Sequence, residues 1–315
     1  MTRISSFGQQ QLLLQGITTN QSRVFEAQRQ ITTGKKAEDF QGLAGETSTV
    51  LGAKSFNSRV ETYQQTIATV RGKLDANDLQ LDGMLTSMRS LQDTIRISLA
   101  NNQSDGFDGV LNQTFQFVNG SLNTNFGGTY LFSGANTGTP PVNVDNLDEL
   151  LALTAPTPPA VAAPVSDAFD NSSVSFKARI ADSVDVDFGL LASDAGTEIY
   201  QVMNDLYDYH TNTTAIDGEL AQPEWNFLQT QLGKLDTAID NLQQIQVNNG
   251  LSYERLDVVD EQHKDTAVFL ETFISSIEDV DIAQAITNLN NDQLALEASY
   301  RSIGSMSRMS LLDFI

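Results

Sequence analysis

The stretch AKSFNSRVETYQQTIATVRGKLDANDLQLDGMLTSMRSLQDTI, residues 53–95, carries an unbroken helical pattern. Its seam residues recur at alternating steps of three and four over six heptads, which is the spacing of a supercoiled helix. A helix of this length would span about 60 Å, so it needs partner helices of similar length. The seam comprises Ala53, Phe56, Val60, Tyr63, Ile67, Val70, Leu74, Asn77, Leu81, Met84, Met88, Leu91 and Ile95.

Three residues of this segment are unusual for a long helix. Asn77 is the one polar amide on the seam, and a lone buried Asn can fix the register and orientation of paired helices. Gly72 and Gly83 lie off the seam, and each destabilises a helix by ~1 kcal/mol relative to Ala. Their presence suggests a close neighbour on the outer face of the helix.

Composition narrows the classes of partner and of chemistry. The 315 residues carry a formal net charge of −22, which makes nucleic acid and anionic membrane surfaces poor partners. The chain has no cysteine, which excludes thiol catalysis, cysteine-ligated metals and disulfides. It has neither an apolar run of membrane-spanning length nor a signal-peptide core at its start. We therefore expect a protein that is soluble when made and that, if exported, does not use a cleaved signal.

The prolines divide the chain into a helical arm, a middle and a second helical arm. All seven lie between residues 140 and 223. In the middle, residues 174–180 and 184–188 alternate apolar and polar side chains as half-buried strands do. Residues 145–194 hold nine acidic side chains against Lys177 and Arg179, which predicts an exposed acidic β insertion.

In the second arm, apolar residues repeat at three-four spacing from Trp225 to Leu242 and again from Leu256 to Val280. We therefore predict a mainly α fold with a small β insertion, in which both chain ends build a long antiparallel coiled-coil rod. The expected domains are a terminal coiled coil (1–40 with 280–315), a helical rod (41–137 with 195–279) and an outer, acidic, β-rich domain (138–194).

Both chain ends carry narrow apolar stripes on faces rich in Gln, Asn, Ser and Thr. In the last segment the stripe recurs at intervals of seven residues. Such stripes bury little in an isolated helix, so the ends should become stable only when they coil around each other or around copies of themselves. The predicted assembly positions are Leu13, Ile17, Val24, Ile31, Ile282, Leu289, Leu296, Tyr300 and Ile303.

Candidate catalytic and metal-ligating residues have simpler structural interpretations. His263 falls in the seam register and is expected to be a packing residue. Asp185 and Asp187 could help to bind a cation, but their alternation with valines places them on the solvent face of a strand. Asp279 and Asp281 would project differently from a helix, so capping or subunit contact is favoured over a catalytic dyad. We predict no enzyme activity, no cofactor and no metal.

At both ends the residues resemble the bacterial flagellin family. Residues 277–283 (IEDVDIA) resemble its carboxy-terminal motif, and residues 246–256 (QVNNGLSYERL) are similar to the glycine-containing helix just upstream. Residues 30–36 (QITTGKK) resemble the motif that closes its first terminal helix. Residues 39–44 (DFQGLA) lack the double-aspartate–proline step that is usual there, so the shape of this turn does not carry over. The matching family positions are Gly34, Gly250, Asp279, Asp281 and Ala283.

Within this family, three stretches are more similar to hook-associated members than to filament flagellins. They are residues 1–5 (MTRIS), residues 127–137 (GGTYLFSGANT) and the ending ASY at 298–300 with MSLLDFI at 309–315. The resemblance covers residues 1–137 and 195–315 and leaves the acidic middle unmatched.

The resemblance implies an extracellular structural protein of the flagellum, exported by the type III apparatus, that joins hook to filament. Its implied partners are copies of itself in a helical ring, a hook or hook-associated protein on one side, flagellin on the other, and an export chaperone. Two alternatives stay open: a short filament flagellin, and a surface-displayed module that binds a cationic ligand through the acidic insertion.

Overall fold

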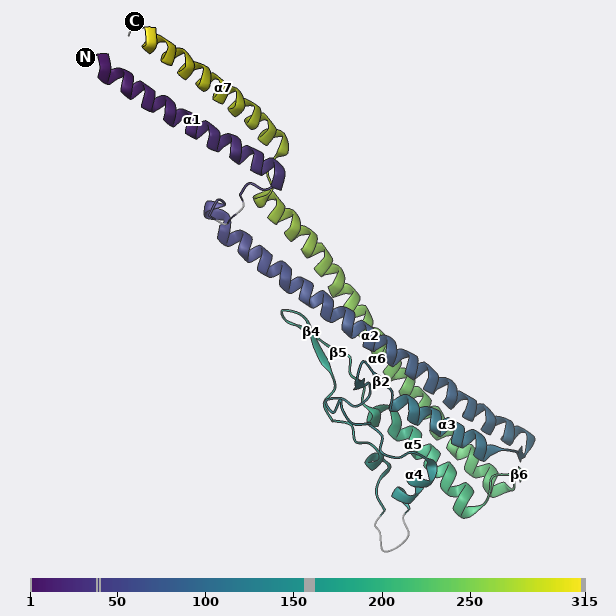
Figure 1. The fold of residues 1–315 in the computed structure, drawn as a ribbon. Coiled ribbons are helices and arrows are strands. Elements are labelled where there is room, and N and C mark those ends of the chain that lie inside the picture. The colour runs from purple at the N-terminus through teal and green to yellow at the C-terminus, as the bar shows by residue number, and fades with distance from the viewer. Residues whose placement is uncertain (1, 38, 40, 156–161, 313–315) are drawn as a thin grey trace. The chain divides into compact units, whose positions relative to one another are not determined.

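The computed structural model describes residues 2–37, 39, 41–155 and 162–312. The predicted turn at 39–45 and the loop at 154–165 therefore lie partly outside the described residues. The last three residues of the ending at 309–315 lie wholly outside them. The chain forms two compact units, Met1–Arg59 with Asp265–Ile315, and Val60–Lys264. We call them the terminal unit and the central unit. The mainly α fold with small antiparallel strands that the sequence predicts is confirmed (Figure 1).

Four long helices account for most of the chain. They are α1 (Thr2–Thr33), α2 (Thr47–Asn101), α6 (Gln222–Glu278) and α7 (Ile282–Leu312). In the central unit α2 and α6 run antiparallel, because Trp225 near the start of α6 donates to the Leu99 carbonyl near the end of α2 at 3.2 Å. Further along, Arg71 and Asp257 form an ion pair at 2.5 Å. Every predicted seam residue of α2 except Phe56 and Tyr63 is buried.

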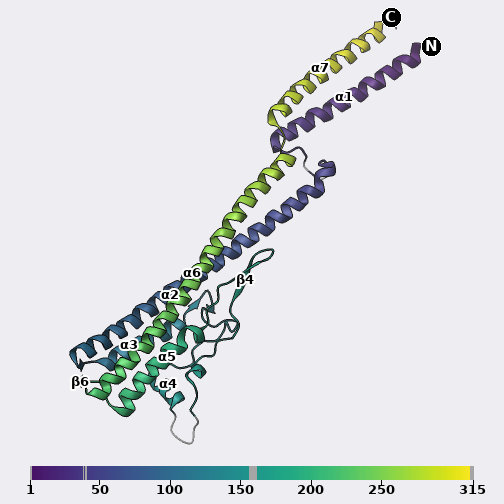
Figure 2. The ribbon, with the colours of Figure 1, turned by 180° about the vertical axis from the view of Figure 1, so that it is seen from behind.

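Shorter helices complete the core of the central unit (Figure 2). They are α3 (Phe107–Leu122), α4 (Leu147–Thr154) and α5 (Ala192–Asp208). Two short helical turns, η2 (Val165–Ala168) and η3 (Tyr209–Thr213), lie in the same unit. A third, η1 (Ala44–Glu46), lies in the terminal unit. The fully buried Tyr200 of α5 contacts the Phe115 ring of α3, with ring centroids 5.1 Å apart. Apolar side chains of the insertion, including Val142 and Leu150, belong to the same core cluster.

The strands form three two-stranded antiparallel pairs. They are β1 (Gln103–Ser104) with β6 (Gly218–Glu219), β2 (Asn125–Phe126) with β3 (Thr129–Tyr130), and β4 (Lys177–Ala181) with β5 (Val184–Asp187). The two predicted strands of the insertion thus form one hairpin, with Arg179 opposite Asp185 and a register shift before Ala181. The prediction of a β-rich insertion missed α4 and η2, so the insertion is a mixture of helix, turn and hairpin.

The hairpin packs against the α2–α6 pair through apolar side chains, among them Ile180 and Val186, and through polar contacts. The amide of Asn77 donates to the Phe188 carbonyl at 3.1 Å, so this buried seam residue contacts the insertion rather than a polar group of a facing helix. His263 Nε2 lies 2.6 Å from the Ile180 carbonyl, and its ring stacks on Tyr63 with centroids 5.5 Å apart. The expectation that His263 is a packing residue agrees with these contacts.

Gly72 and Gly83 of α2 differ in their surroundings. A Cβ at Gly83 would lie 2.9 Å from the Phe117 ring of α3, so this glycine does have the close neighbour that the sequence suggests. A Cβ at Gly72 would meet no atom within 4 Å among the described residues, so that expectation is wrong for Gly72.

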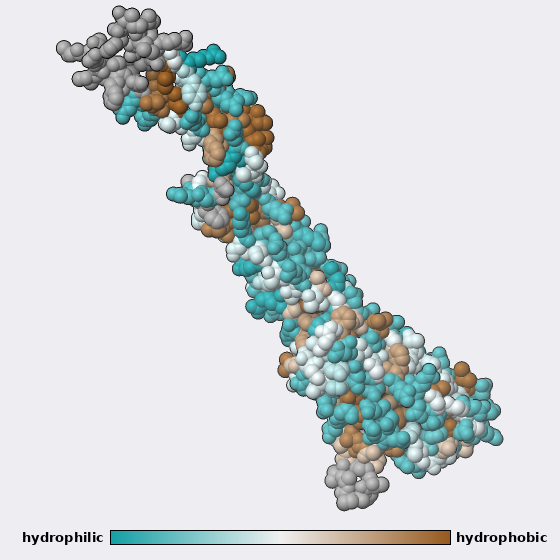
Figure 3. Space-filling view, viewed as in Figure 1, coloured by the Kyte–Doolittle hydropathy of each residue, from teal (hydrophilic) through white to brown (hydrophobic). Residues whose placement is uncertain are grey.

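In the terminal unit α1 and α7 lie side by side and antiparallel (Figures 1 and 2). Among the described residues, both clusters of buried apolar side chains lie within the central unit, and none lies in the terminal unit. Figure 3 shows apolar surface on the described part of the terminal helix pair. The terminal unit thus has long helices but little core.

Candidate functional site: the terminal helix pair and its junction

The predicted assembly positions form a thin seam between α1 and α7. Ile17 is the only one of them that is buried, and Ile282 and Tyr300 remain 42% and 48% exposed. Because apolar burial supplies most of the stability of a helix pair, this seam stabilises the pair only weakly. The half-buried positions are Leu13, Val24, Ile31, Leu289, Leu296 and Ile303.

Polar contacts join the two helices at their middle. Gln21 Nε2 donates to the Tyr300 hydroxyl at 2.7 Å, and the Asn20 amide donates to the Ser299 hydroxyl at 3.4 Å. Exposed neutral hydrogen bonds exchange for bonds to water and add little net stability. These two hydrogen bonds therefore fix which residues of α1 and α7 lie opposite each other more than they stabilise the helix pair.

The terminal unit also exposes large apolar side chains outside the predicted seam. Phe25 of α1 is 69% exposed, although it is aromatic and lies in mid-helix. Single exposed apolar residues are ordinary, but here many of them occur in a unit that has no core cluster among its described residues. In the sequence these apolar residues lie off the narrow stripe. The predicted assembly positions followed the stripe alone and therefore left them out. The others are Leu12, Leu14, Leu51, Val268, Phe269, Ile286 and Leu294; Phe56, a predicted seam residue of α2, is exposed as well.

Between the long helices, two short breaks pair with each other through the backbone. The first follows α1 at Gly34, whose φ of +71° is a left-handed conformation that side chains with a Cβ rarely adopt. The Val280 N–H donates to the Gly34 carbonyl at 2.9 Å, and the Lys36 N–H donates to the Glu278 carbonyl at 2.7 Å. Lys35 and Asp279 thereby form an antiparallel bridge, and we call residues 34–36 with 278–281 the junction.

Ion pairs cover the junction. The Lys35 ammonium lies 2.6 Å from Asp279 Oδ1 and 3.4 Å from Glu278, which also pairs with Lys54 of α2 at 2.5 Å. The hydrogen bond from Lys54 lowers the pKa of Glu278, and that from Lys35, aided by the Ser275 hydroxyl, lowers the pKa of Asp279. The same contact with Asp279 raises the pKa of Lys35. The junction therefore favours the charged form of all three groups.

Side chains of the junction also cap the adjoining helix ends. Asp281 Oδ1 accepts from the N–H groups of Ala283 and Gln284 at 2.9 and 3.1 Å, which is an N-cap for α7. The Lys36 ammonium donates to the Ser276 and Ile277 carbonyls at 2.8 Å, where the helix dipole of α6 is negative.

The structure thus brings Gly34, Asp279, Asp281 and Ala283 together at one place. The two aspartates have separate structural contacts and do not form a shared acid–base pair. Gly250 lies elsewhere, at an exposed position within α6 in the central unit. Among the residues that the structure describes, no three His, Cys, Asp or Glu side chains are grouped so that they could hold a metal.

The helices at both ends of the chain match models of one known protein family. Residues 4–137 match the bacterial flagellin N-terminal helical region, and residues 232–315 match the bacterial flagellin C-terminal helical region. The two matches together span more than two-thirds of the chain. The chain belongs to the bacterial flagellin family. As a flagellin-family protein it is a structural, non-enzymatic component of the flagellum.

Solved structures with a similar fold include two chains of low sequence identity. One is a Vibrio parahaemolyticus protein assigned as a flagellar hook-associated protein, with 17% identity and a TM-score of 0.56, covering 74% of this flagellin-family chain and 97% of its own. The other is Bacillus cereus FlgL, with 13% identity and a TM-score of 0.54, covering 71% and 98%. At such identities the likeness concerns the fold.

Two further findings concern the chain as a whole. No curated protein matches its sequence significantly. Among the described helices, none combines the length and the hydropathy that a membrane crossing requires.

Proposed function

We propose that this protein joins the flagellar hook to the filament and that its terminal unit folds fully only on assembly. The observation that carries the proposal is the contrast between the two units. The central unit holds both described core clusters, whereas the terminal unit exposes Phe25 and other large apolar side chains along its helices. Burial of that surface between subunits would offset the entropy lost when the helices become ordered.

Two lines of support favour the junction role over that of a filament flagellin. The first is the similarity of residues 1–5, 127–137 and the carboxy-terminal ending to hook-associated members. The second is that both solved structures named above are described as a hook-associated protein or as FlgL. In this chain residues 127–137 begin with the β2–β3 turn, where Gly127 and Gly128 have φ values of +62° and +85°.

The proposed partners follow from this role. Copies of the protein would form a helical ring, with a hook or another hook-associated protein on one side and flagellin on the other. The protein would be extracellular and exported through the flagellar type III apparatus, and an export chaperone would cover the exposed apolar stripes before assembly. The net charge of −22 argues against nucleic acid and anionic membranes as partners.

The alternative is a short filament flagellin, which the family matches support equally and which would share the same terminal unit. Deletion of the gene separates the two roles. A junction protein predicts cells with hooks but no filaments, and intact flagellin subunits shed into the medium. Normal or merely shortened filaments would contradict the junction role and identify one flagellin among several.

Complementation sharpens this experiment. The wild-type gene should restore filaments in the deletion strain, whereas Leu296→Glu, which places a charge on the α1–α7 seam, should not. The matched control is Gln293→Glu, because residue 293 is exposed on the same helix and the substitution adds the same charge. Export of the Leu296→Glu protein into the medium would show that the defect lies in assembly.

A further inference from the structure

The β4–β5 hairpin has two outer edges, and the register of its strands shows which backbone groups lie on each. The Phe188 N–H donates to the Phe176 carbonyl at 3.1 Å. In an antiparallel pair such hydrogen-bonded positions alternate with positions whose backbone groups point away from the partner strand. By this alternation Lys177 and Arg179 of β4 direct their N–H and C=O groups away from β5. Asp187 of β5, which lies opposite Lys177, directs its own groups away from β4.

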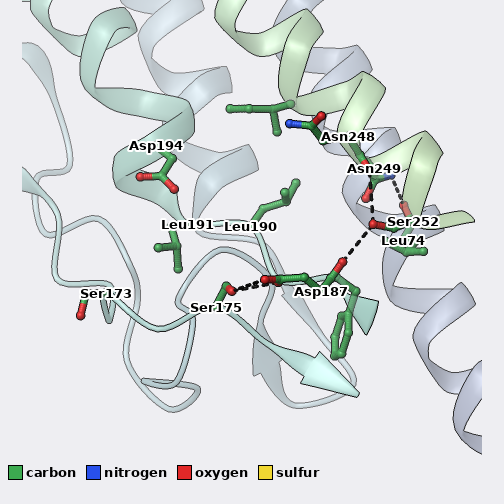
Figure 4. Close-up of a pocket in the computed structure, with 13 residues that line it drawn as sticks. Leu74, Ser173, Ser175, Asp187, Leu190, Leu191, Asp194, Asn248, Asn249 and Ser252 are labelled. Atoms are coloured by element: carbon green, nitrogen blue, oxygen red, sulfur yellow. Dashed lines mark hydrogen bonds between the residues drawn. The ribbon is translucent and has the colours of Figure 1, made fainter. Parts of the chain in front are cut away.

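The outer edges of β5 and β4 differ in their surroundings. On the β5 side, the Ser252 hydroxyl of α6 donates to the Asp187 carbonyl at 2.9 Å (Figure 4). In the part of the chain that the structure describes, β4 pairs with β5 alone, and no hydrogen bond joins the outward backbone groups of Lys177 or Arg179 to another residue. Both residues are exposed. The outer edge of β4 therefore offers two N–H donors and two C=O acceptors to a further strand.

The side chains of the same two residues are basic. Lys177 and Arg179 are the only basic residues between positions 145 and 194, and their side chains are 64% and 62% exposed. Asp185 and Asp187 pair with Arg179 and Lys177 across the hairpin at 2.9 and 3.5 Å. Asp185 takes two of the five N–H donors of the guanidinium, and the contact to the Lys177 ammonium is long. Both cations therefore keep donors for a group on the open side.

Charge decides which strand suits this edge. Side chains opposite each other on neighbouring strands lie about 4.5–5.5 Å apart, whereas those two strands away lie about 10 Å apart. At physiological ionic strength the Debye length is about 8 Å, so an incoming strand responds to Lys177 and Arg179 more than to the aspartates of β5. A β4 strand from a second copy would bring these cations opposite each other, because its outward positions are again residues 177 and 179. Like charges in that position are destabilising, which argues against self-pairing.

We propose that the outer edge of β4 binds an extended acidic segment of another polypeptide, which adds a third strand to the hairpin. The backbone of that segment pairs with the outward groups of Lys177 and Arg179, and its Asp or Glu side chains, at alternate positions, lie opposite the two cations. The residues between the acids point to the same side as Ala178, where the hairpin packs on the helices, so small or β-branched apolar residues suit them. The inference is independent of the hook–filament role.

Peptide binding to the full-length protein at pH 7 and about 0.15 M salt tests the proposal. The probe is a dye-labelled peptide of sequence TEVEVET, followed by fluorescence anisotropy. It should bind about tenfold more tightly than TKVKVKT, which has the same strand pattern with the opposite charge. Equal affinity for the two peptides would overturn the proposal.

N-methylation of the peptide tests the backbone pairing without any change to the protein. In the proposed register the Glu N–H groups of TEVEVET face β4, and the Val N–H groups face away from it. N-methyl groups on the glutamates should therefore weaken binding about tenfold, and N-methyl groups on the valines should leave it nearly unchanged. Equal effects of the two methylation patterns would rule out the third strand.

Substitutions in β4 locate the binding. Lys177→Gln and Arg179→Gln each remove one cation and should raise the Kd for TEVEVET about threefold to fivefold. Lys177→Pro also removes an outward N–H at the first residue of the strand, where proline is tolerated, and should raise Kd about threefold beyond Lys177→Gln. Arg96→Gln is the matched control, since it removes a half-exposed, ion-paired cation of α2 outside the hairpin, and it should leave Kd unchanged.

Two results would show that the edge has another occupant or none. The same Kd for wild type, Lys177→Gln and Arg179→Gln would place the peptide elsewhere and overturn the proposal. Sedimentation velocity addresses a second copy as the occupant: wild-type dimers that Lys177→Pro converts to monomers would show that β4 pairs with another β4, which also overturns it. Neither result bears on the hook–filament role, which the gene deletion tests.

Discussion

The backbone N–H of Val280 donates to the carbonyl of Gly34 at 2.9 Å. This bond joins the segment that ends α1 to the segment that begins α7, although the two lie at opposite ends of the chain. Together with the Lys36–Glu278 bond it makes the two helix breaks into one structural element. The junction is therefore the place where the terminal unit can be tested most directly.

The left-handed backbone at Gly34 makes this residue hard to replace. Space around a Cβ at Gly34 is open, so the penalty for Gly34→Ala is conformational, about 1–2 kcal/mol. We expect the Val280 amide of this variant to exchange hydrogen about 5–30 times faster than in wild type. Gly52→Ala, in open space within α2, is the control and should stabilise its helix by about 0.5–1 kcal/mol. An unchanged Val280 amide in Gly34→Ala would contradict this reading.

The thin α1–α7 seam should tolerate no buried charge in the assembled state. Leu296→Glu is expected to abolish polymerisation, because a carboxylate that assembly buries on this seam without a partner destabilises the assembled state by several kcal/mol. The central unit should stay folded, with an unchanged protease-resistant fragment covering residues 60–264. Sedimentation of the purified variants measures the effect, with Gln293→Glu as the charge-matched control. Normal polymers of Leu296→Glu would rule out the terminal seam as an assembly contact.

Hydrogen exchange on the monomer should separate the two units. We expect amides of residues 2–35 and 285–312 to open with a free energy below about 2 kcal/mol, since the helix pair has little core. Amides of α3 and α5 in the central core should approach the global stability of about 5–15 kcal/mol. In polymers the terminal amides should become protected. Strong protection of the terminal helices already in the monomer would argue against assembly-coupled folding.

Acid should open the junction. Because the pKa values of Glu278 and Asp279 are lowered in the folded state, their contribution to stability is fully present above the unfolded pKa values of about 4. It is lost as the pH falls through the lower, folded values. For Lys35 the sign is reversed: its raised pKa stabilises below its unfolded value, and that contribution is lost only in strong base.

Exchange of the Val280 amide, followed from pH 7 to pH 3 and corrected for intrinsic rates, measures this acid response. Lys54→Gln removes the first partner of Glu278 and should reduce the response. Arg301→Gln removes an exposed pair within α7 and should leave it unchanged. A response that is the same in wild type and Lys54→Gln would show that the ion pair does not stabilise the junction.

The long helices could be predicted from the sequence because their signal is local and periodic. The seam of α2 recurs every three or four residues, and nearly all of it is buried in the structure. The helix α4 was missed although its start has a capping signal: Asn146 caps the Glu149 N–H, and Glu149 reaches back to the Asp145 N–H. Proline-rich surroundings and many acidic residues concealed a helix of eight residues.

The candidate site was harder to predict, because its residues come from segments far apart in the sequence. The family resemblance marked Gly34, Asp279 and Asp281 individually. Nothing in the sequence pattern showed that the segment at Gly34 pairs with the segment at Asp279. Likewise Asn77 reads as a helix-register residue, and only the tertiary structure shows its amide against the Phe188 carbonyl. Local periodicity carries no information about such contacts.

Synthesis imposes an order on the bonds of the junction. A ribosome completes Gly34 early, and Val280 and α7 emerge only when nearly all of the chain has been translated. The core residues of the central unit, the last of which is Val259, are all made before α7, so α1 still lacks its partner helix when that core can first form. In the assembly that we propose, the order of residues would act as a timer, because the surface of the terminal unit is complete only when α7 has been made.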